Sequence, residues 1–286
     1  MNTESPTTIG PEDIEMRLFL EAIYLRYGCD FREYSEVHIK RRILNLLTMS
    51  GLSSISEMQH QALYDAAFFE TLRQSFSINV TEMFRDPPFY KAVREKIVPK
   101  LKSLAFARIW HPGCASGEEI YSMAILLTEE GVYEKTRLYA TDFNPQILEK
   151  AKAGAYALDR MKTYTRNYQK SGGQASFADY YAASRDAAIL DERLKKNIHF
   201  AEHNLATDGV FGEMDMIVCR NVLIYFTRKL QDRVLKLFAD SLHPGGFLCL
   251  GSQESLKFSA WADCFEPVVD SEKIYRKKTD STDAAD

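Results

Sequence analysis

The first quarter of the chain has the apolar spacing of helices and no convincing strand pattern. Between residues 12 and 76 the apolar side chains that recur near helical spacing are Ile14, Leu18, Ile23, Leu25, Val37, Leu44 and Leu47. Gly28 and Gly51 interrupt this pattern, and Ser53–Ser54 followed by Glu57 is typical of a helix start. We therefore expect an all-α domain over residues 11–76, packed by its own apolar stripes, after a loose Ser/Thr/Pro-rich start at residues 1–10.

From about residue 105 short apolar strands alternate with helices. The pattern predicts strands at 107–110, 137–141, 198–202, 216–219 and 247–251, and helices at 118–130, 145–153 and 228–242. Strands separated by helices favour a mostly parallel sheet with helices on both faces. Pro244-Gly-Gly is expected to form a turn, and segments 262–269 and 273–276 flank Asp270-Ser-Glu272, which predicts a closing antiparallel hairpin. We thus expect an α/β domain at 105–276, joined to the helical domain by a linker at 77–104.

The stretch between Gly154 and Asn197 is too long for a simple connection in such a fold. It is polar and rich in tyrosine, so we expect an inserted subdomain over residues 155–196. The polar residues 277–286 are expected to form a disordered tail.

Composition narrows the class of protein only moderately. The 286 residues include 36 Lys+Arg and 40 Asp+Glu, a formal net charge of −4, and 45% hydrophobic residues, which excludes a disordered or collagen-like chain. The slight negative charge argues against bulk binding to nucleic acid or to an anionic membrane surface. Five scattered cysteines without a C-x-x-C pair favour a reducing compartment, and we find neither a signal-peptide layout nor a membrane-spanning apolar run. We therefore expect a cytoplasmic protein.

The turn after the first predicted strand carries the first chemical signal. Gly113 and Gly117 bracket a turn that leads into a helix, which is a common but weak sign of a nucleotide-type site. Glu118 and Glu119 follow in the first helical turn, where they suit the helix dipole but would repel a pyrophosphate. They would favour a cationic ligand such as S-adenosylmethionine, which has a sulfonium, an ammonium and no phosphate. Asp142, at the end of the second strand, stands where a ribose-binding acid is expected.

Four blocks of sequence resemble the chemoreceptor glutamate methyltransferases of bacterial chemotaxis, the CheR family. They are NVTEMFR at 79–85, GCASGEE at 113–119, ATD at 140–142 and CRNVLIYF at 219–226, and the similarity extends from about residue 12 to 276. The family usually has GASTGEE in the second block, so Cys114 is a departure that we expect to be tolerated. The resemblance implies a Rossmann-like, seven-stranded S-adenosylmethionine-dependent methyltransferase fold with an all-α amino-terminal domain and a small inserted subdomain.

The resemblance also implies roles for individual residues. Asn79, Thr81 and Arg85 would close over the cofactor, with Arg85 facing its methionine carboxylate. Gly113 would lie in the cofactor turn, either Glu118 or Glu119 would bind the ammonium, and Asp142 would hold the ribose hydroxyls. Asn204 and Leu205 would border the adenine, while Arg220 and Asn221 would lie beside the reacting methyl, with Tyr225 one helical turn on. The plainer alternatives are an ion pair of Arg85 with Asp86 or with a surface acid, a turn role for Asn204 and a packing role for Tyr225 and Phe226.

The implied reaction has simple requirements. A glutamate carboxylate, with a reference pKa of about 4.3, is ionised at neutral pH and can attack a sulfonium methyl without a general base, leaving S-adenosylhomocysteine. We expect Arg220 and Tyr225 to position the incoming carboxylate, Asn221 to hold the geometry of the site, and Cys219 to be buried and inert. His199 and His203 lack the further ligands that a zinc site needs, so we expect no metal.

The substrate side rests on fewer residues. Lys40, Arg41 and Arg42 form a basic run, which is a solvated helix face or, as the resemblance implies, a docking surface for the cytoplasmic methylation helices of a receptor. The insertion corresponds to a subdomain that in some relatives docks a receptor's carboxyl-terminal peptide. The expected function is methyl esterification of receptor glutamates for sensory adaptation. The alternatives are a same-fold methyltransferase for a small molecule or another signalling receptor, and a non-catalytic cofactor-sensing module that binds receptors.

Overall fold

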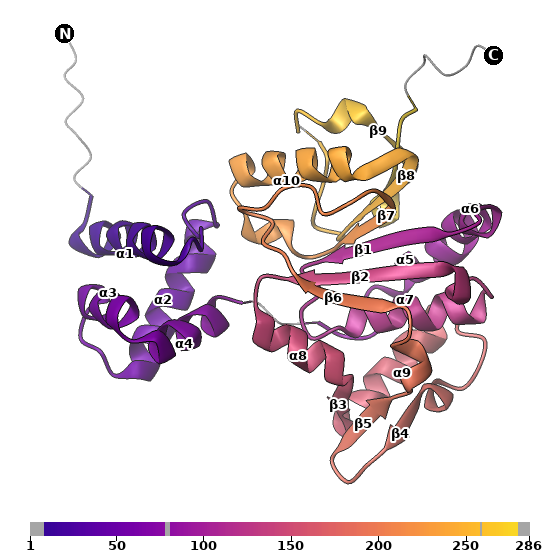
Figure 1. Cartoon of the computed structure of the whole chain (residues 1–286), viewed down its shortest axis with the longest axis horizontal. Helices are drawn as coiled ribbons and strands as arrows, with labels where there is room; N and C mark the ends of the chain where they lie inside the picture. Colours follow the sequence, from indigo (N-terminus) through magenta and orange to yellow (C-terminus); the bar gives the residue numbers. More distant parts are fainter. Residues whose placement is uncertain (1–8, 78–80, 258, 280–286) are drawn as a thin grey trace. The chain divides into compact units, whose positions relative to one another are not determined.

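The computed structural model describes residues 9–77, 81–257 and 259–279, and the chain divides into two compact units. The first unit consists of residues 1–78 and 225–230, and the second of residues 79–224 and 231–286. The helices of the first unit are α1 (Pro11–Tyr27), α2 (Glu36–Ser50), α3 (Ile55–Tyr64) and α4 (Ala66–Phe76) (Figure 1). The boundary thus falls close to the end of the predicted helical domain. None of the helices in the described ranges is long and apolar enough to span a bilayer.

The core of the first unit uses a different set of apolar residues from the predicted stripes. The buried positions of α1 and α2 are Met16, Phe19, Leu20, Ile23, Ile39, Ile43 and Leu46. Of the predicted residues Ile23 is buried, whereas Ile14, Leu18, Leu25, Val37 and Leu44 are exposed. Helical spacing alone allowed several faces, and only packing against the other helices selects one of them. The helix start at Ser54 is confirmed, since Ser54 Oγ accepts the Glu57 N–H at 3.1 Å.

A short segment from late in the chain completes the first unit. The N–H of Ser35 donates to the carbonyl of Tyr225 at 2.8 Å, and Tyr34 forms an isolated β-bridge with Phe226. Phe226 is buried, as expected, and packs edge-on against Tyr34. The segment 225–230 therefore belongs structurally to the helical unit, although it directly follows strand and turn residues of the second unit.

A seven-stranded sheet forms the centre of the second unit, which confirms the predicted fold class. Its strand order is β6-β2-β1-β7-β8-β10-β9. The strands are β1 (Ala107–Pro112), β2 (Thr136–Asp142), β6 (Ile198–Glu202), β7 (Met214–Cys219), β8 (Leu242–Leu250), β9 (Phe265–Val269) and β10 (Ile274–Lys277). The five neighbouring strands β6, β2, β1, β7 and β8 run parallel, and β9 and β10 form the predicted antiparallel hairpin. The connecting helices are α7 (Glu118–Glu129), α8 (Pro145–Ala153) and α10 (Arg228–Ser241) (Figure 1).

Two segments differ from their sequence interpretation. Residues 77–104, treated above as a linker, contain α5 (Pro87–Ala92), a π-helical turn (Val93–Ile97) and α6 (Val98–Ser103). Phe89, Tyr90 and Ile97 of this run are buried in the core of the second unit, so apolar packing makes it a part of that unit. Pro244-Gly-Gly lies within β8 instead of forming a separate turn, next to a register irregularity between β7 and β8.

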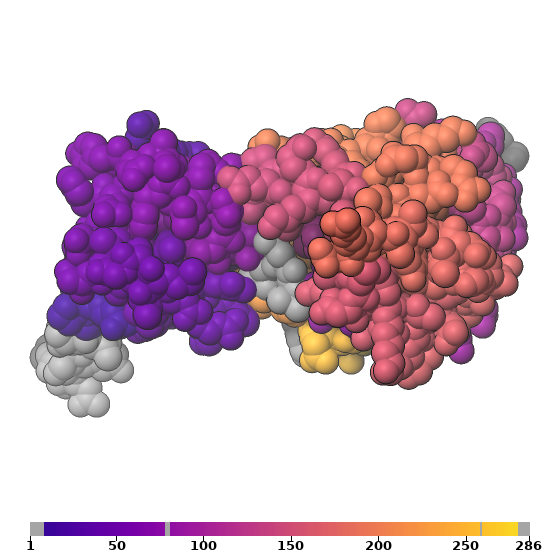
Figure 2. Space-filling view, turned by 90° about the horizontal axis from the view of Figure 1, so that it is seen from below, coloured from indigo at the N-terminus to yellow at the C-terminus, as the bar shows by residue number. Residues whose placement is uncertain are grey.

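The residues between 155 and 196 form the expected insertion. Strands β3 (Ala155–Ala157), β4 (Tyr181–Ala183) and β5 (Ala187–Leu190) make a separate antiparallel sheet in the order β3-β5-β4, and helix α9 (Met161–Lys170) lies between β3 and β4. In the space-filling view the insertion, coloured between magenta and orange, is an exposed lobe of the second unit (Figure 2).

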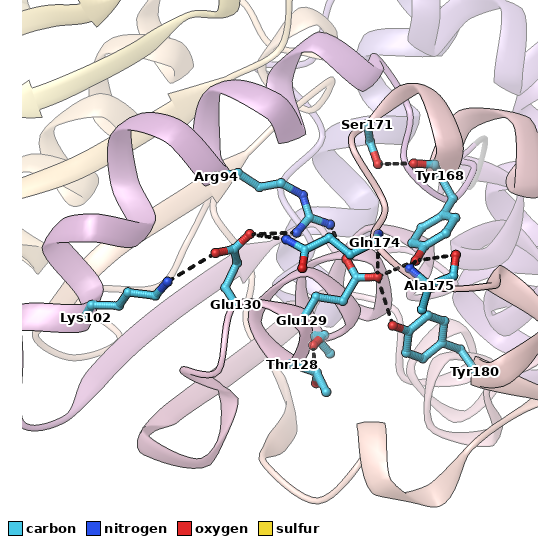
Figure 3. Close-up of polar contacts among 11 residues, drawn as sticks. Arg94, Lys102, Thr128, Glu129, Glu130, Tyr168, Ser171, Gln174, Ala175 and Tyr180 are labelled. Carbon is cyan, nitrogen blue, oxygen red and sulfur yellow. Dashed lines mark hydrogen bonds and ion pairs between the residues drawn. The ribbon is translucent and has the colours of Figure 1, made fainter.

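Helix α7 anchors this insertion through the two acids at its carboxyl end. Glu129 accepts hydrogen bonds from the hydroxyl groups of Tyr168 and Tyr180, and it also pairs with Arg94 (Figure 3). Glu130 pairs with Arg94 at 3.0 Å and accepts from Gln174 Nε2 at 3.0 Å. Because these acids bind the π-helical turn and the insertion at once, the insertion is fixed on the core of the second unit.

Candidate active site

The carboxyl ends of four neighbouring parallel strands bring the predicted residues to one edge of the sheet. Strand β1 leads into Gly113, β2 ends in Asp142, β6 is followed by His203 and Asn204, and β7 is followed by Arg220. These strands are adjacent in the order β6-β2-β1-β7, and the chain reverses its direction of winding between β1 and β7. Ligands of open α/β sheets bind at such a switch point, so this edge is the candidate active site.

The glycine turn after β1 needs its glycines for conformation and for space. Gly113 has φ 67° and Gly117 φ 92°, both in the left-handed region that favours glycine. A Cβ on Gly113 would lie 2.7 Å from Val222 Cγ2, so this glycine permits the close approach of the turns after β1 and β7. Ala115 also has a positive φ, 49°, between the two glycines. The turn is therefore held in an unusual backbone shape beside the switch point.

Asp142 ties this turn to the end of β2. Its carboxylate is 6% exposed and accepts the N–H of Ala115 at 3.1 Å and that of Asn144 at 3.0 Å. Burial raises the pKa of Asp142 to about 6, although these N–H groups act in the opposite direction. An acid so placed can accept hydrogen bonds from ligand hydroxyls when it is ionised.

Glu118 is buried on the side of α7 that faces the insertion. Its carboxylate accepts the hydroxyl of Ser116 at 2.6 Å and contacts the hydroxyl of Tyr164 at 3.3 Å. The cation nearest to it among the described residues is Arg160 of the insertion, 3.6 Å away. Burial raises the pKa of Glu118, and these partners only partly offset that effect. Glu118 thus presents a carboxylate whose charge is incompletely balanced.

Glu119 faces the end of β7, and close partners offset the charge of its carboxylate. It accepts from Arg220 Nη1 at 3.0 Å and lies 3.3 Å from His111 Nδ1. Burial alone would raise the pKa of Glu119, but His111 and Arg220 together lower it. Of the two glutamates, Glu118 therefore has the less balanced carboxylate, and which of them binds the cofactor's ammonium stays a prediction.

Arg220 is at the centre of the β7 side of the site. Its side chain is 2% exposed, pairs with Asp86 at 2.7 Å as well as with Glu119, and lies 4.1 Å from the ring centre of Phe89. It also donates to the carbonyl of Arg85 at 3.3 Å. Asp86 thus pairs with Arg220, and the Arg85–Asp86 alternative is not tested by this contact. A guanidinium held by two carboxylates and an aromatic face favours a positioning role over direct contact with an incoming carboxylate.

Backbone strain gathers at the same edge. Among the described non-glycine residues, those with positive φ are Phe84, Asp86, Ala115, Asn221 and Lys273, and all but Lys273 belong to the turns of this site. Phe84 is held by its N–H bond to Ser122 Oγ at 2.9 Å. Conformations of this kind persist where the surroundings over-determine them, which is common at functional sites.

Glu254 is a site residue that the sequence analysis did not identify. Its buried carboxylate accepts the N–H groups of Gly251 and of the consecutive residues Asn221, Val222 and Leu223, the last at 2.7 Å. These bonds hold the turn after β7 and the positive φ of Asn221, which is 61°. An acid three residues after the glycine that follows β8 was the available signal.

The remaining predicted residues have varied positions. Asn204 shapes a turn, since its Oδ1 accepts the Ala206 N–H at 3.0 Å, and Leu205 is buried; their adenine contact stays a prediction. Thr81 is half-buried, and its carbonyl accepts a hydrogen bond from Arg160 at 3.4 Å. Asn79 lies outside the described residues. Tyr225 belongs to the helical unit, where it packs edge-on against His38.

The cysteines and histidines near the site are the remaining candidates for thiol chemistry or metal binding. Cys219 is fully buried, as expected, and burial raises its pKa well above its usual range; the same holds for Cys114. His203 is buried against the carbonyl of Gly209 at 3.0 Å, whereas His199 is exposed. Within the part of the chain that the structure describes, no group of three His, Cys, Asp or Glu residues could hold a metal ion.

Comparison with known proteins agrees with this geometry. Residues 79–269 match a family described as CheR methyltransferase, SAM binding domain, and residues 14–77 match the CheR methyltransferase all-alpha domain. A Pseudomonas putida protein provisionally named methyltransferase Cher3 is 51% identical over 93% of this chain and 97% of its own length. A chemotaxis protein methyltransferase of Listeria innocua is 30% identical over 83% and 88%.

Solved structures add little to these matches. The N-methyltransferase NodS of Bradyrhizobium japonicum aligns with 68% of this chain and 91% of its own, with 16% identity and a TM-score of 0.36. A likeness of that size carries no argument about the reaction or its substrate.

Proposed function

The chain belongs to the CheR methyltransferase family, and we propose that it converts glutamate side chains of methyl-accepting chemoreceptors to γ-methyl esters, for sensory adaptation in chemotaxis. Its cofactor is S-adenosylmethionine. The observation that carries the proposal is the placement of two buried carboxylates, Glu118 and Asp142, after the neighbouring strands β1 and β2. The proposed acceptor lies in the cytoplasmic helical part of the receptor, so the enzyme would act in the cytoplasm.

The donor set fits this cofactor better than a dinucleotide. Glu118 would take the cofactor's ammonium, because its carboxylate is buried and the cation that pairs with it, Arg160, lies 3.6 Å away and is itself exposed. Asp142 would accept the ribose hydroxyls, and Asn204 with Leu205 would border the adenine. The acids at the start of α7 would oppose a pyrophosphate at the helix N-terminus, where a dinucleotide normally places it.

The arrangement requires little acid–base chemistry of the protein. The bound cofactor supplies an electrophilic methyl group, and a glutamate carboxylate is a nucleophile that is already ionised at neutral pH. The protein's part is to orient the acceptor and exclude water. Arg220 would fix the Arg85–Asp86 backbone, and Glu254 would fix Asn221 beside the reacting methyl. Tyr225 would help to position the acceptor.

The helical unit offers features for docking a protein substrate. Lys40 of the basic run pairs with Glu12 at 2.8 Å and Asp13 at 3.0 Å within the unit, whereas Arg41 is exposed and Arg42 is half-buried. Val37 and Leu44, on the same helix as Arg41, are exposed apolar residues. A surface with a cation among apolar side chains suits a receptor helix that carries acidic methylation sites. Where the receptor ends in a docking peptide, the insertion would bind that carboxyl-terminal peptide.

The proposal is tested by incubating the full chain with receptor cytoplasmic fragments and S-adenosylmethionine labelled in its methyl group. We expect label on the receptor that is released as methanol by mild base, and its loss when the acceptor glutamates are changed to alanine. Base-stable label, or no label on any receptor fragment, would overturn the proposal.

A charge reversal separates docking from cofactor binding. Arg41→Glu should lower the rate of transfer to the receptor about tenfold while leaving S-adenosylhomocysteine affinity unchanged, because Arg41 belongs to the helical unit. Arg166→Glu, an exposed arginine of α9, is the matched control and should transfer normally. If Arg41→Glu transfers as the control does, the docking assignment fails.

A further inference from the structure

The insertion places a cation at the cofactor site. Arg160 directly precedes α9, and its Nη1 lies 3.6 Å from Glu118 Oε1. The same nitrogen lies 3.4 Å from the carbonyl of Thr81 and 3.3 Å from the hydroxyl of Tyr164. These distances are at the long end for hydrogen bonds and ion pairs, so the guanidinium is loosely held.

The exposure of the two side chains differs sharply. The side chain of Arg160 is 55% exposed, whereas that of Glu118 is 2% exposed. The carboxylate is therefore fixed in place, and the guanidinium can change partner at small cost because its outer end is solvated. An ion pair with one rigid and one adjustable member is suited to exchange when a ligand arrives.

The position of Arg160 is set by how the insertion is anchored. Asn167 Nδ2 of α9 donates to the carbonyl of Met83 at 3.1 Å, and the hydroxyl of Tyr156 donates to the carbonyl of Ser116 at 2.8 Å. Tyr168, near the far end of α9, binds Glu129, and Gln174, which follows the helix, binds both Glu129 and Glu130 (Figure 3). The insertion is thus hydrogen-bonded both to Met83, in the segment before α5, and to the glycine turn after β1. These bonds keep Arg160 close to Glu118.

The amino-acid end of S-adenosylmethionine is a zwitterion, with an ammonium and a carboxylate on one carbon. We propose that Arg160 is a cofactor-binding residue that exchanges partners: it pairs with Glu118 in the free protein and with the cofactor carboxylate in the complex, where the ammonium takes its place on Glu118. The exchange replaces one ion pair by two and leaves no charge unpaired. Arg160 would thus share the carboxylate with Arg85, the residue that the family resemblance assigns to it.

The test is calorimetric binding of three probes, with no transfer reaction in the readout. S-adenosylhomocysteine has the whole amino-acid end, decarboxylated S-adenosylmethionine has the ammonium alone, and 5′-methylthioadenosine has neither. We expect Arg160→Ala to weaken S-adenosylhomocysteine about tenfold, which corresponds to about 1.4 kcal/mol. Affinity for the other two probes should change less than about twofold. Arg160→Lys, which keeps the charge but not the planar fork, should recover part of the loss.

The controls make the outcome decisive. Arg166→Ala, an exposed arginine on the same helix, should bind all three probes as the unchanged protein does. Unchanged binding of S-adenosylhomocysteine to Arg160→Ala overturns the inference. An equal loss for the decarboxylated probe shows that Arg160 acts only through Glu118, and an equal loss for methylthioadenosine shows general damage; each also overturns it. The inference rests on the proposed cofactor contacts, but because it is tested by binding, a failure to methylate receptors would leave its outcome readable.

Discussion

The two sides of the α7 N-terminus differ although they begin at adjacent glutamates. On the β7 side, Arg220 pairs with Glu119 and Asp86, and the carboxylate of Glu254 accepts backbone N–H groups. On the insertion side, Glu118 has hydroxyl donors and only the loosely held Arg160 as a cation. Burial acts on both glutamates, yet the pKa of Glu119 is lowered and that of Glu118 is raised. The β7 side thus holds the backbone of the site, and the insertion side is the one that we propose for the ligand.

The difference arises because Glu118 and Glu119, in the first turn of α7, point toward different parts of the unit. Consecutive residues on a helix point about 100° apart, so Glu118 and Glu119 face different elements. One faces the end of β7 and the other faces the insertion. On the β7 side, Arg220 donates to the carbonyl of Arg85 and Glu254 accepts the N–H of Asn221, so these bonds hold the strained backbone around Asp86 and Asn221. The carboxylate of Glu118 on the insertion side is less balanced.

Breaking the β7 side should produce the largest effect. Arg220→Met would remove the buried cation that Glu119 shares with the half-buried Asp86, so we expect the free energy of unfolding to fall by about 3 kcal/mol. Urea denaturation followed by circular dichroism measures it. If the two sides are as different as the geometry indicates, Glu118→Gln should unfold within about 0.5 kcal/mol of the unchanged protein. Equal losses in the two variants would remove the distinction.

On the insertion side, Glu118→Gln should affect cofactor binding instead of stability. Glu118→Gln keeps an oxygen for the Ser116 hydroxyl but removes the charge, so S-adenosylhomocysteine should bind roughly 30- to 100-fold more weakly, about 2–3 kcal/mol. Titration calorimetry gives the dissociation constant. Normal affinity in this variant would shift the ammonium assignment to another acid.

Glu254 sharpens the comparison because it supports the β7 side without carrying an ion pair. Glu254→Gln removes one of the two oxygens that accept backbone N–H groups, and we expect stability to fall by about 2 kcal/mol. The rate of methyl transfer should fall more than the affinity for S-adenosylhomocysteine, since the turn holds Asn221. Glu95→Gln, at an exposed position of the π-helical turn, serves as the control. A variant with normal stability and normal rate would show that the turn does not need this carboxylate.

The smallest effect concerns pH. Burial raises the pKa of Asp142 to about 6. If Asp142 accepts the ribose hydroxyls as proposed, its ionised form should bind best, so we expect full cofactor affinity above that pH and a loss as the pH falls through it. S-adenosylhomocysteine should bind about tenfold more weakly at pH 5 than at pH 7.5. Glu118, whose pKa burial also raises, acts in the same direction. In Glu118→Gln the remaining pH dependence should therefore belong to Asp142, and a flat profile in that variant would contradict this assignment.

Much of the architecture followed from local patterns in the sequence. Alternating strands and helices, the closing hairpin and the long insertion were all predicted, because element type depends on apolar spacing and on turn residues close by in the chain. The fully buried Cys219 and the Ser54 helix start followed in the same way. The apolar face of α1 did not, since several faces have helical spacing and only the packing of neighbouring helices selects one.

The sequence by itself determined which acids and glycines follow each strand, and hence the class of cofactor. Only the tertiary structure distinguished Glu118 from Glu119, brought Glu254 to the turn after β7 and placed Arg160 of the insertion beside Glu118. The physical reason is that the state of a buried charge depends on the partners within a few ångströms. Those partners come from segments up to about a hundred residues away, and spacing along the chain carries no record of them.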